Sequence, residues 1–156
     1  MTREIETLEL LNQQIHQAHR RAVDAELARR GLSEVSHPML MTILQSYEQG
    51  GGPCQAQREL AQRLHISPPA VANSLKSLEK SGYIRREPEA SDARCNRVFL
   101  TEKGRQAVEG CQAAFLAVSE QMLAGFTPEE QAQLSQFRQR MLANLRGEAP
   151  VSKEES

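Results

Sequence analysis

Two helical patterns that meet with almost nothing between them constrain the fold of this chain most. Residues 57–65 carry apolar side chains at helical spacing, and after Ile66 the pair Ser67-Pro68 starts a second helix. The second helix, about residues 68–80, buries a face with apolar residues at i, i+4 and i+7, namely Val71, Leu75 and Leu78. Its opposite face is small, polar and basic. The sequence therefore predicts two helices joined by a tight turn, with one polar face exposed.

A pair of short strands is predicted directly after these helices. Gly82 closes the second helix, and residues 83–87 and 97–101 are rich in strand-forming side chains. Within these strands Ile84, Val98 and Leu100 are predicted to face inward. Residues 88–96 form a polar loop that is too long for the tightest hairpin turns. We expect this loop to project as a mobile tip.

Amphipathic helices flank this unit on both sides. The first covers residues 4–30 and ends at Gly31, where a left-handed conformation is expected. A second begins after residues 36–38, where Ser and an early Pro suit a helix start, a fifth is capped by Thr101, and a sixth begins at the capping box 127–130. Some apolar positions exceed what the central unit can cover, namely Leu8, Leu11, Ile15, Val108, Phe115, Leu134, Phe137 and Met141. We therefore expect two protomers to share a core as a homodimer.

The predicted fold class is mainly α with a small β-hairpin wing, that is, a winged helix-turn-helix with N- and C-terminal dimerisation helices. The dimerisation helices are assigned to residues 1–34 and 105–146. The winged helix-turn-helix domain occupies residues 35–104, and residues 147–156 are predicted to form a flexible tail.

Composition narrows the class of protein further. With 156 residues, 39% apolar, the chain fits one soluble globular domain or one subunit of a small oligomer. No apolar run approaches the ~20 residues of a membrane-spanning helix, and no signal-peptide core is present, so we expect a cytoplasmic protein with no membrane partner. Three cysteines fit reduced thiols better than a disulfide framework. The sequence lacks GxSxG, HExxH, Walker-loop and GxGxxG motifs, so we predict no enzyme activity, no cofactor and no metal site.

Charge is distributed unevenly along the chain. The net charge is −1, yet residues 57–105 hold ten Lys/Arg against six Asp/Glu, while both flanking segments carry more acidic than basic residues. A basic block can be an ordinary solvated face. Here it coincides with the two helices and the hairpin, which is the arrangement that lets one helix enter a major groove ~12 Å wide. The predicted partner is therefore double-stranded DNA.

At this point the chain resembles the MarR (multiple antibiotic resistance regulator) family. The resemblance rests on Asp92-x-Arg94, followed six residues after the Arg by Leu100-Thr101-x-x-Gly104, and on a preceding set of helix-turn-helix residues. That set is Leu60-Ala61, Ser67, Val71, Leu75, Leu78-Glu79, Gly82-Tyr83-Ile84 and Arg86. The resemblance implies that the terminal helices make an obligate dimer and that the paired winged domains bind a pseudo-palindrome. One departure is that Ala72-Asn73 stands where the family commonly has Thr-Arg.

Base and phosphate contacts are predicted on the second helix and the wing. Asn73 can read an adenine edge, Lys76 and Lys80 can meet phosphates, and Arg94 at the tip can enter a minor groove. By resemblance, Asp92 braces the wing. The full predicted DNA-binding set is Ser67, Pro69, Ala70, Asn73, Lys76, Ser77, Lys80, Arg86, Asp92, Arg94, Asn96 and Arg97.

The function predicted from these features is that of a sequence-specific DNA-binding transcriptional regulator. By resemblance it is a dimeric repressor that a small-molecule effector releases from a pseudo-palindromic operator. One alternative is a thiol-based redox sensor using Cys95, whose neighbours Arg94 and Arg97 could lower a thiol pKa. The other alternative is a structural winged-helix module that does not bind DNA.

Four residues are candidates for the effector site. His16 and His19 lie one turn apart on the first helix, and His37 and Met41 begin the second. The three histidines could bind a metal or an anion. By resemblance, a zinc-sensing member of the family would carry further His and Glu ligands on the fifth helix, where this sequence has no His. Because related proteins of the family bind phenolic acids and similar small molecules, the resemblance implies a small aromatic or anionic effector. The alternative is that His37 caps a helix and the nearby methionines are core residues.

Overall fold

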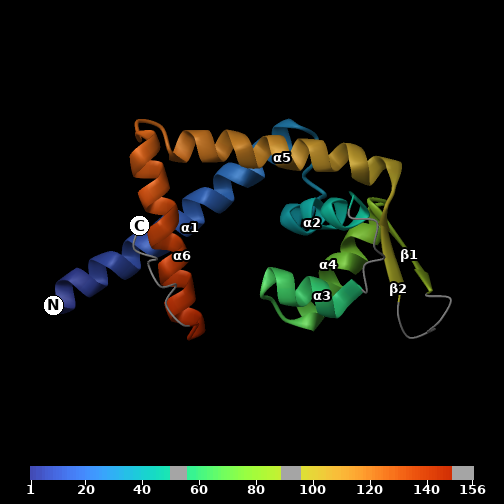
Figure 1. The fold of residues 1–156 in the computed structure, drawn as a ribbon. Coiled ribbons are helices and arrows are strands. Elements are labelled where there is room, and N and C mark those ends of the chain that lie inside the picture. The colour runs from blue at the N-terminus through green and yellow to red at the C-terminus, as the bar shows by residue number, and fades with distance from the viewer. Residues whose placement is uncertain (50–55, 89–95, 149–156) are drawn as a thin grey trace, which may run out of the picture. The chain divides into compact units, whose positions relative to one another are not determined.

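The computed structural model describes residues 1–49, 56–88 and 96–148, drawn as a ribbon in Figure 1. The chain divides into two compact units, Met1–Val118 and Ser119–Ser156. In the described part, the predicted fold class is confirmed, with helices and one two-stranded sheet. The elements are α1 (Thr2–Arg29), α2 (Pro38–Gln49), α3 (Ala56–Leu64), α4 (Pro68–Lys80), β1 (Ile84–Pro88), β2 (Asn96–Leu100), α5 (Glu102–Met122) and α6 (Pro128–Arg146).

The end of α1 follows from one glycine. Gly31 has φ +69°, and its N–H donates to the carbonyl of Ala28 at 3.1 Å. The N–H of Leu32 donates to the carbonyl of Leu27 at 2.9 Å, which completes the bond pair of a Schellman motif. Leu32 then packs against the core. The predicted left-handed residue at the end of the first helix is confirmed.

The turn between α3 and α4 uses the same geometry with a different residue. His65 has φ 51°, and the N–H of Ile66 donates to the carbonyl of Ala61 at 3.2 Å. Ser67 then caps α4, because its Oγ accepts from the N–H of Ala70 at 3.3 Å. The predicted tight turn is therefore present, and it holds a non-glycine residue in the left-handed region.

The wing is an antiparallel hairpin that begins and ends one residue away from the predicted strands. Ile84 pairs with Leu100 and Arg86 pairs with Val98. Ile84, Val98 and Leu100 are buried, as predicted. Just outside these strands the N–H of Thr101 still donates to the carbonyl of Tyr83 at 3.0 Å, while the N–H of Tyr83 donates to the carbonyl of Leu78 in the turn after α4.

Thr101 and Gly104 join the wing to α5. The Thr101 Oγ1 accepts from the N–H of Gly104 at 3.0 Å and donates to the carbonyl of Gly82 at 2.6 Å. A Cβ at position 104 would lie 2.0 Å from the carbonyl oxygen of Tyr83. The Leu-Thr-x-x-Gly pattern thus forms the joint between the wing and α5. In it the Thr101 hydroxyl caps the helix, and the missing side chain of Gly104 lets the α5 backbone approach that of Tyr83.

The core lies in the first unit and draws on every element from α1 to α5. Leu40, Leu60, Leu75, Leu78 and Leu100 are all at most 1% exposed. Val108, predicted above to be surplus apolar surface for a dimer, is fully buried in this core, so that part of the expectation is wrong. In contrast, α6 buries no residue.

Candidate nucleic-acid interface

The outer face of α4 is polar, basic and exposed. Val71, Leu75 and Leu78 turn into the core, which leaves Pro69, Asn73, Lys76 and Lys80 exposed and Ala70 and Ser77 partly exposed. Ser67 is exposed too, although its hydroxyl is engaged in the helix cap. No bulky apolar side chain stands on this face, so the helix backbone can approach a groove closely.

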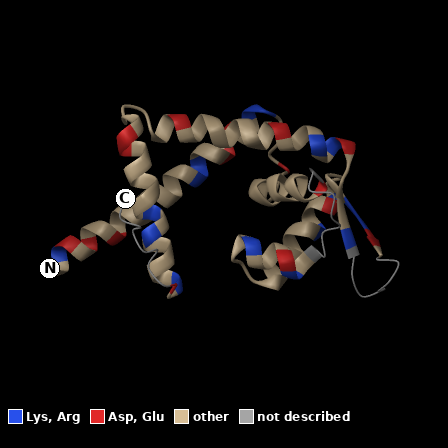
Figure 2. Ribbon diagram, viewed as in Figure 1, with Lys and Arg blue, Asp and Glu red and all other residues tan. Residues whose placement is uncertain are grey.

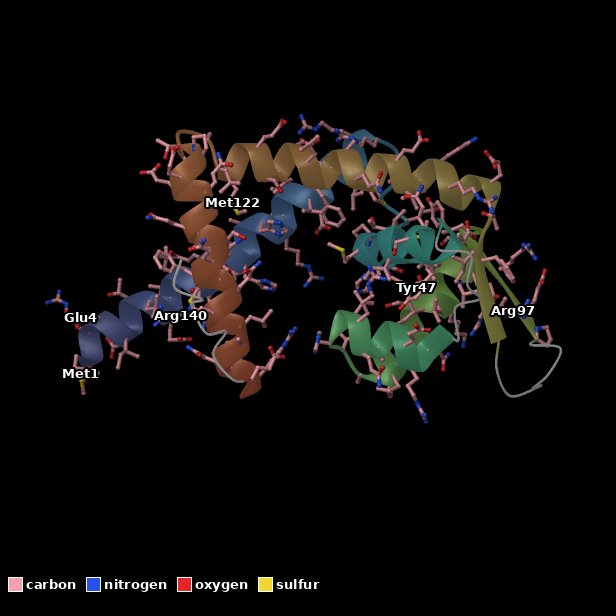
Figure 3. The ribbon with its side chains drawn as sticks, in the orientation of Figure 1. Met1, Glu4, Tyr47, Arg97, Met122 and Arg140 are labelled. Carbon is pink, nitrogen blue, oxygen red and sulfur yellow. The ribbon has the colours of Figure 1, made fainter. Side chains whose placement is uncertain are left out.

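The two strands of the wing carry a second group of basic residues, drawn as blue segments in Figure 2. The Arg85 guanidinium lies over the Phe99 ring, 4.6 Å from its centroid, and forms an ion pair with Glu87. Arg97, labelled on β2 in Figure 3, is partly exposed and pairs in register with Glu87. The wing strands therefore carry guanidinium groups, and two of them, those of Arg85 and Arg97, belong to residues beside Glu87.

Arg86 differs from the other wing cations. Its Nε donates to Glu79 Oε2 at 3.2 Å and its terminal nitrogen donates to Glu79 Oε1 at 3.0 Å. The bond to Arg86 holds the pKa of the Glu79 carboxyl below its usual range, and it raises the pKa of Arg86. Arg86 was predicted as a DNA contact, and in this structure its guanidinium is bound by α4.

Glu48 is a second acidic residue that holds the wing. Its Oε1 accepts from the N–H of Leu100 in β2 at 2.8 Å, and its Oε2 lies 3.4 Å from Arg105 Nε in α5. One carboxylate thus ties α2, the wing and α5 together. Close by on α2, the Tyr47 ring (Figure 3) lies 5.3 Å from the Arg63 guanidinium carbon of α3. The sequence interpretation missed Glu48 because its partner is a backbone group 52 residues away.

Several predicted contacts lie outside the described residues. Asp92 and Arg94 belong to this group, as do Cys95 and all but the first and last residues of the predicted loop. Asn96 is described only through its backbone, as the first residue of β2. Their roles at DNA remain predictions, as do those of the α4 residues.

The four candidate effector residues are placed differently from one another. His16 is exposed and His19 partly exposed on α1, whereas Met41 is fully buried in the core. His37 Nδ1 accepts from the N–H of Leu40 at 3.1 Å, so His37 and not Ser36 caps α2. Burial lowers the pKa of His37, which favours the neutral ring that this cap requires. Among the described residues, no three His, Cys, Asp or Glu gather as a metal site would need.

Cys111 is a core residue, as predicted. It is fully buried, and desolvation raises the pKa of its thiol to about 11. A neutral buried thiol is a poor nucleophile.

The relatives of this chain identify its family. A sequence profile of the MarR family matches residues 31–94. The transcriptional regulator PA3341 is 31% identical, and the match covers 90% of this chain and 98% of that chain with a TM-score of 0.67. This chain belongs to the MarR family.

Other solved structures share the MarR fold. S. aureus MepR, solved in a complex with DNA, has a TM-score of 0.75 at 23% identity. The match covers 87% of this chain and 96% of the MepR chain. The transcriptional regulator SlyA has a TM-score of 0.72 at 21% identity, with 87% and 93% covered. As a MarR-family protein, this chain is a DNA-binding transcriptional regulator and not an enzyme. None of the described helices combines the length and hydropathy needed to cross a bilayer.

Proposed function

We propose that this regulator works as a homodimer that binds a pseudo-palindromic operator, represses transcription there, and is released by a small aromatic or anionic effector. Each protomer places α4 in a major groove and the tip of its wing in the adjoining minor groove. In this proposal residues 35–104 are the DNA-binding domain, and residues 1–34 and 105–146 supply the dimer interface.

The exposed face of α4 carries the DNA-binding part of the proposal. Its apolar side is sealed in the core, and its outer side offers an amide at Asn73 and ammonium groups at Lys76 and Lys80. An amide can pair with the adenine edge, whereas ammonium groups neutralise phosphates. MepR, a protein of this fold, is solved bound to DNA.

The terminal helices carry the dimer part of the proposal. Apolar side chains on α1 and α6 are 40% exposed or more, namely Ile5, Leu8, Leu10, Leu11, Ile15, Phe137, Met141, Leu142 and Leu145. A monomer that exposed so many large apolar residues would be an association hazard. A second copy of the chain supplies the same surface by symmetry, and a two-fold dimer matches a two-fold operator.

An aromatic or anionic effector fits what the fold is seen to carry elsewhere. PefR, described as a heme sensor and solved with heme, has a TM-score of 0.64 at 23% identity to this chain. Heme is both aromatic and anionic. A thermal-shift screen of such compounds, followed by DNA release and a reporter assay with the selected operator, tests the effector and the repressor mode.

Selection of bound sequences from random DNA, followed by footprinting, tests the proposed recognition. Two protected half-sites should lie about one helical turn apart. Asn73→Ala should lose base preference at one position and weaken binding by roughly 1–3 kcal/mol. Lys80→Ala is the matched control, because it should weaken all sequences alike and flatten the salt dependence by about one unit of slope. Unchanged base preference in Asn73→Ala would show that α4 does not lie in the groove as proposed.

A further inference from the structure

We infer that Glu79 and Arg86 together set the position of the wing relative to α4, so that both are needed for tight DNA binding although neither touches DNA. The inference rests on the proposed use of α4 and the wing as the two DNA-contacting parts. It reassigns Arg86 from a DNA contact to a positioning residue, and it makes an acidic residue on a DNA-binding helix a requirement for binding.

The register of the hairpin directs Arg86 toward α4. Arg86 pairs with Val98, and in an antiparallel sheet paired residues project from the same face. Val98 is 5% exposed, so this face of the wing is the one packed on the core. Arg85 and Glu87, one residue to either side, project from the opposite face and are exposed. Arg86 is therefore on the inner side of the wing.

The bond between the two side chains fixes an orientation as well as a distance. Both oxygens of Glu79 accept from two different nitrogens of Arg86, at 3.2 and 3.0 Å. A planar guanidinium facing a planar carboxylate in this way holds its partner in one geometry, which a lysine cannot do. The side chains are 24% and 39% exposed, so solvent screens the pair and its value lies in placement more than in stability.

A second attachment, at the base of the wing, fixes the direction of the hairpin relative to α4. The N–H of Gly82 donates to the carbonyl of Glu79 at 3.0 Å, and the Gly82 carbonyl in turn accepts from the Thr101 hydroxyl at 2.6 Å. The base of the hairpin is thus fixed by backbone bonds. Arg86 lies two residues beyond Ile84, farther along the strand, and there its bond to Glu79 ties the strand to the last turn of α4. Two separated attachment points define the direction of a hairpin, whereas one would leave it free to pivot.

Two explanations of Glu79 predict opposite effects of Glu79→Gln on DNA affinity: one considers only its charge, and the other its role in positioning the wing. Glu79→Gln removes a negative charge from the helix that faces a polyanion, and it leaves Arg86 without a carboxylate, so charge alone predicts tighter DNA binding. Loss of position predicts weaker binding. Glu59→Gln is the matched control, because Glu59 is an exposed carboxylate on α3 in the same domain. It should leave affinity unchanged or raise it slightly.

The experiment measures operator affinity, its salt dependence and the preference for A·T flanks for Glu79→Gln, Arg86→Lys, Arg86→Glu and the double exchange Glu79→Arg with Arg86→Glu. Positioning predicts a loss of roughly tenfold in Glu79→Gln and in Arg86→Lys, which keeps the charge. It also predicts weakened flank preference in both. The double exchange restores an opposed pair and should regain most of the affinity that Arg86→Glu loses.

Three results would overturn the inference. One is tighter or unchanged binding by Glu79→Gln; another is wild-type affinity in Arg86→Lys, which would indicate a plain phosphate contact. The third is a double exchange as weak as Arg86→Glu alone, because a glutamate at a DNA contact cannot be rescued from α4. Thermal unfolding of each variant separates local repositioning from loss of the fold. If the double-exchange variant does not fold, the DNA affinity of Arg86→Lys still decides between the two explanations. Failure of the wild-type chain to select any operator would instead contradict the proposed function.

Discussion

The proposed winged domain (residues 35–104) and α6 differ in whether their apolar side chains are buried. In the winged domain Leu40, Leu60, Leu75 and Leu78 are fully buried, and the described part of the chain has no buried side-chain polar atom without a partner. In α6 no residue is buried, although its start is well formed, with Thr127 and Glu130 completing a capping box. Local helix signals are strong in both regions, but only one of them has a core within this chain.

This difference shows that helix caps and the burial of apolar side chains are separate sources of stability in this protein. A capping box starts α6 and the left-handed Gly147 ends it, and an N-cap of this kind typically contributes about 1 kcal/mol. Exposed Phe137 and Met141 indicate that most of the free energy of packing is still to be gained. The winged domain gains it within the chain, and α6 gains it, in the proposed dimer, from a second copy.

Phe137→Asp should have the largest effect, because it places a charge in the proposed dimer interface of α6. A carboxylate in the proposed interface cannot be desolvated without a partner, so the dimer should dissociate. Because binding of two linked half-sites exceeds binding of one by ~10²–10⁴ in affinity, operator binding should fall by at least about 100-fold. Light scattering and operator titration measure the two effects. Gln136→Asp, an exposed neighbour on α6, is the matched control and should stay dimeric.

Gly104→Ala should have the largest effect inside the winged unit. Its Cβ would lie 2.0 Å from the Tyr83 carbonyl oxygen, a backbone atom held in the turn after α4. We expect a loss of about 2–3 kcal/mol in the free energy of unfolding, measured with urea. Gly110→Ala in the same helix meets the end of the Leu32 side chain instead, which can move, so it should cost much less. Equal effects would contradict the view that backbone approach defines this joint.

His37 should make the stability of the winged unit depend on pH. Its Nδ1 accepts from Leu40 only when the ring is neutral, and burial lowers its folded-state pKa below the ordinary 6.5. The folded state therefore binds fewer protons than the unfolded state at this residue, so its contribution is complete above pH 6.5 and is lost as pH falls through the folded-state pKa. Urea unfolding at several pH values should show His37→Asn, which keeps a capping oxygen, losing this dependence. His16→Asn, on an exposed histidine, should keep it.

Glu48→Gln should have the smallest effect. Its amide oxygen can still accept from the Leu100 N–H, and only the ion pair with the half-exposed Arg105 is lost, which is worth about 0.5 kcal/mol or less. Glu48→Ala removes the acceptor from a buried residue and should cost about 1–3 kcal/mol. If the two variants lose equal free energy of unfolding, the ion pair and not the backbone bond is what Glu48 supplies.

Residues that act on their immediate neighbours could be predicted from the sequence. Gly31, Thr101 and the capping box at Thr127 all bond within four residues of themselves or end a periodic segment, and the structure confirms each. The inward faces of α4 and the wing followed from periods of 3.6 and 2. These signals are local, so the fold class could be predicted with them alone.

Contacts between distant residues could not be predicted. Nothing local in the sequence distinguishes Glu48 from the exposed acidic residues, because its partner lies in another element. Arg86 was grouped with the wing cations because its charge was visible and the strand register was not. Ser36 has the better capping side chain in general, yet the chain enters α2 so that His37 reaches the Leu40 N–H. Val108 carried a helical stripe that fits a core and a dimer interface equally well.

The most direct test of the proposed dimer is the mass of the wild-type chain in solution. If a second copy of the chain covers α6 and the exposed stripe of α1, light scattering should give twice 17.4 kDa throughout the micromolar range. The same sample should unfold in a concentration-dependent transition. A 17.4 kDa particle at micromolar concentration, with its helicity and cooperative unfolding intact, would show that the protein is not an obligate dimer.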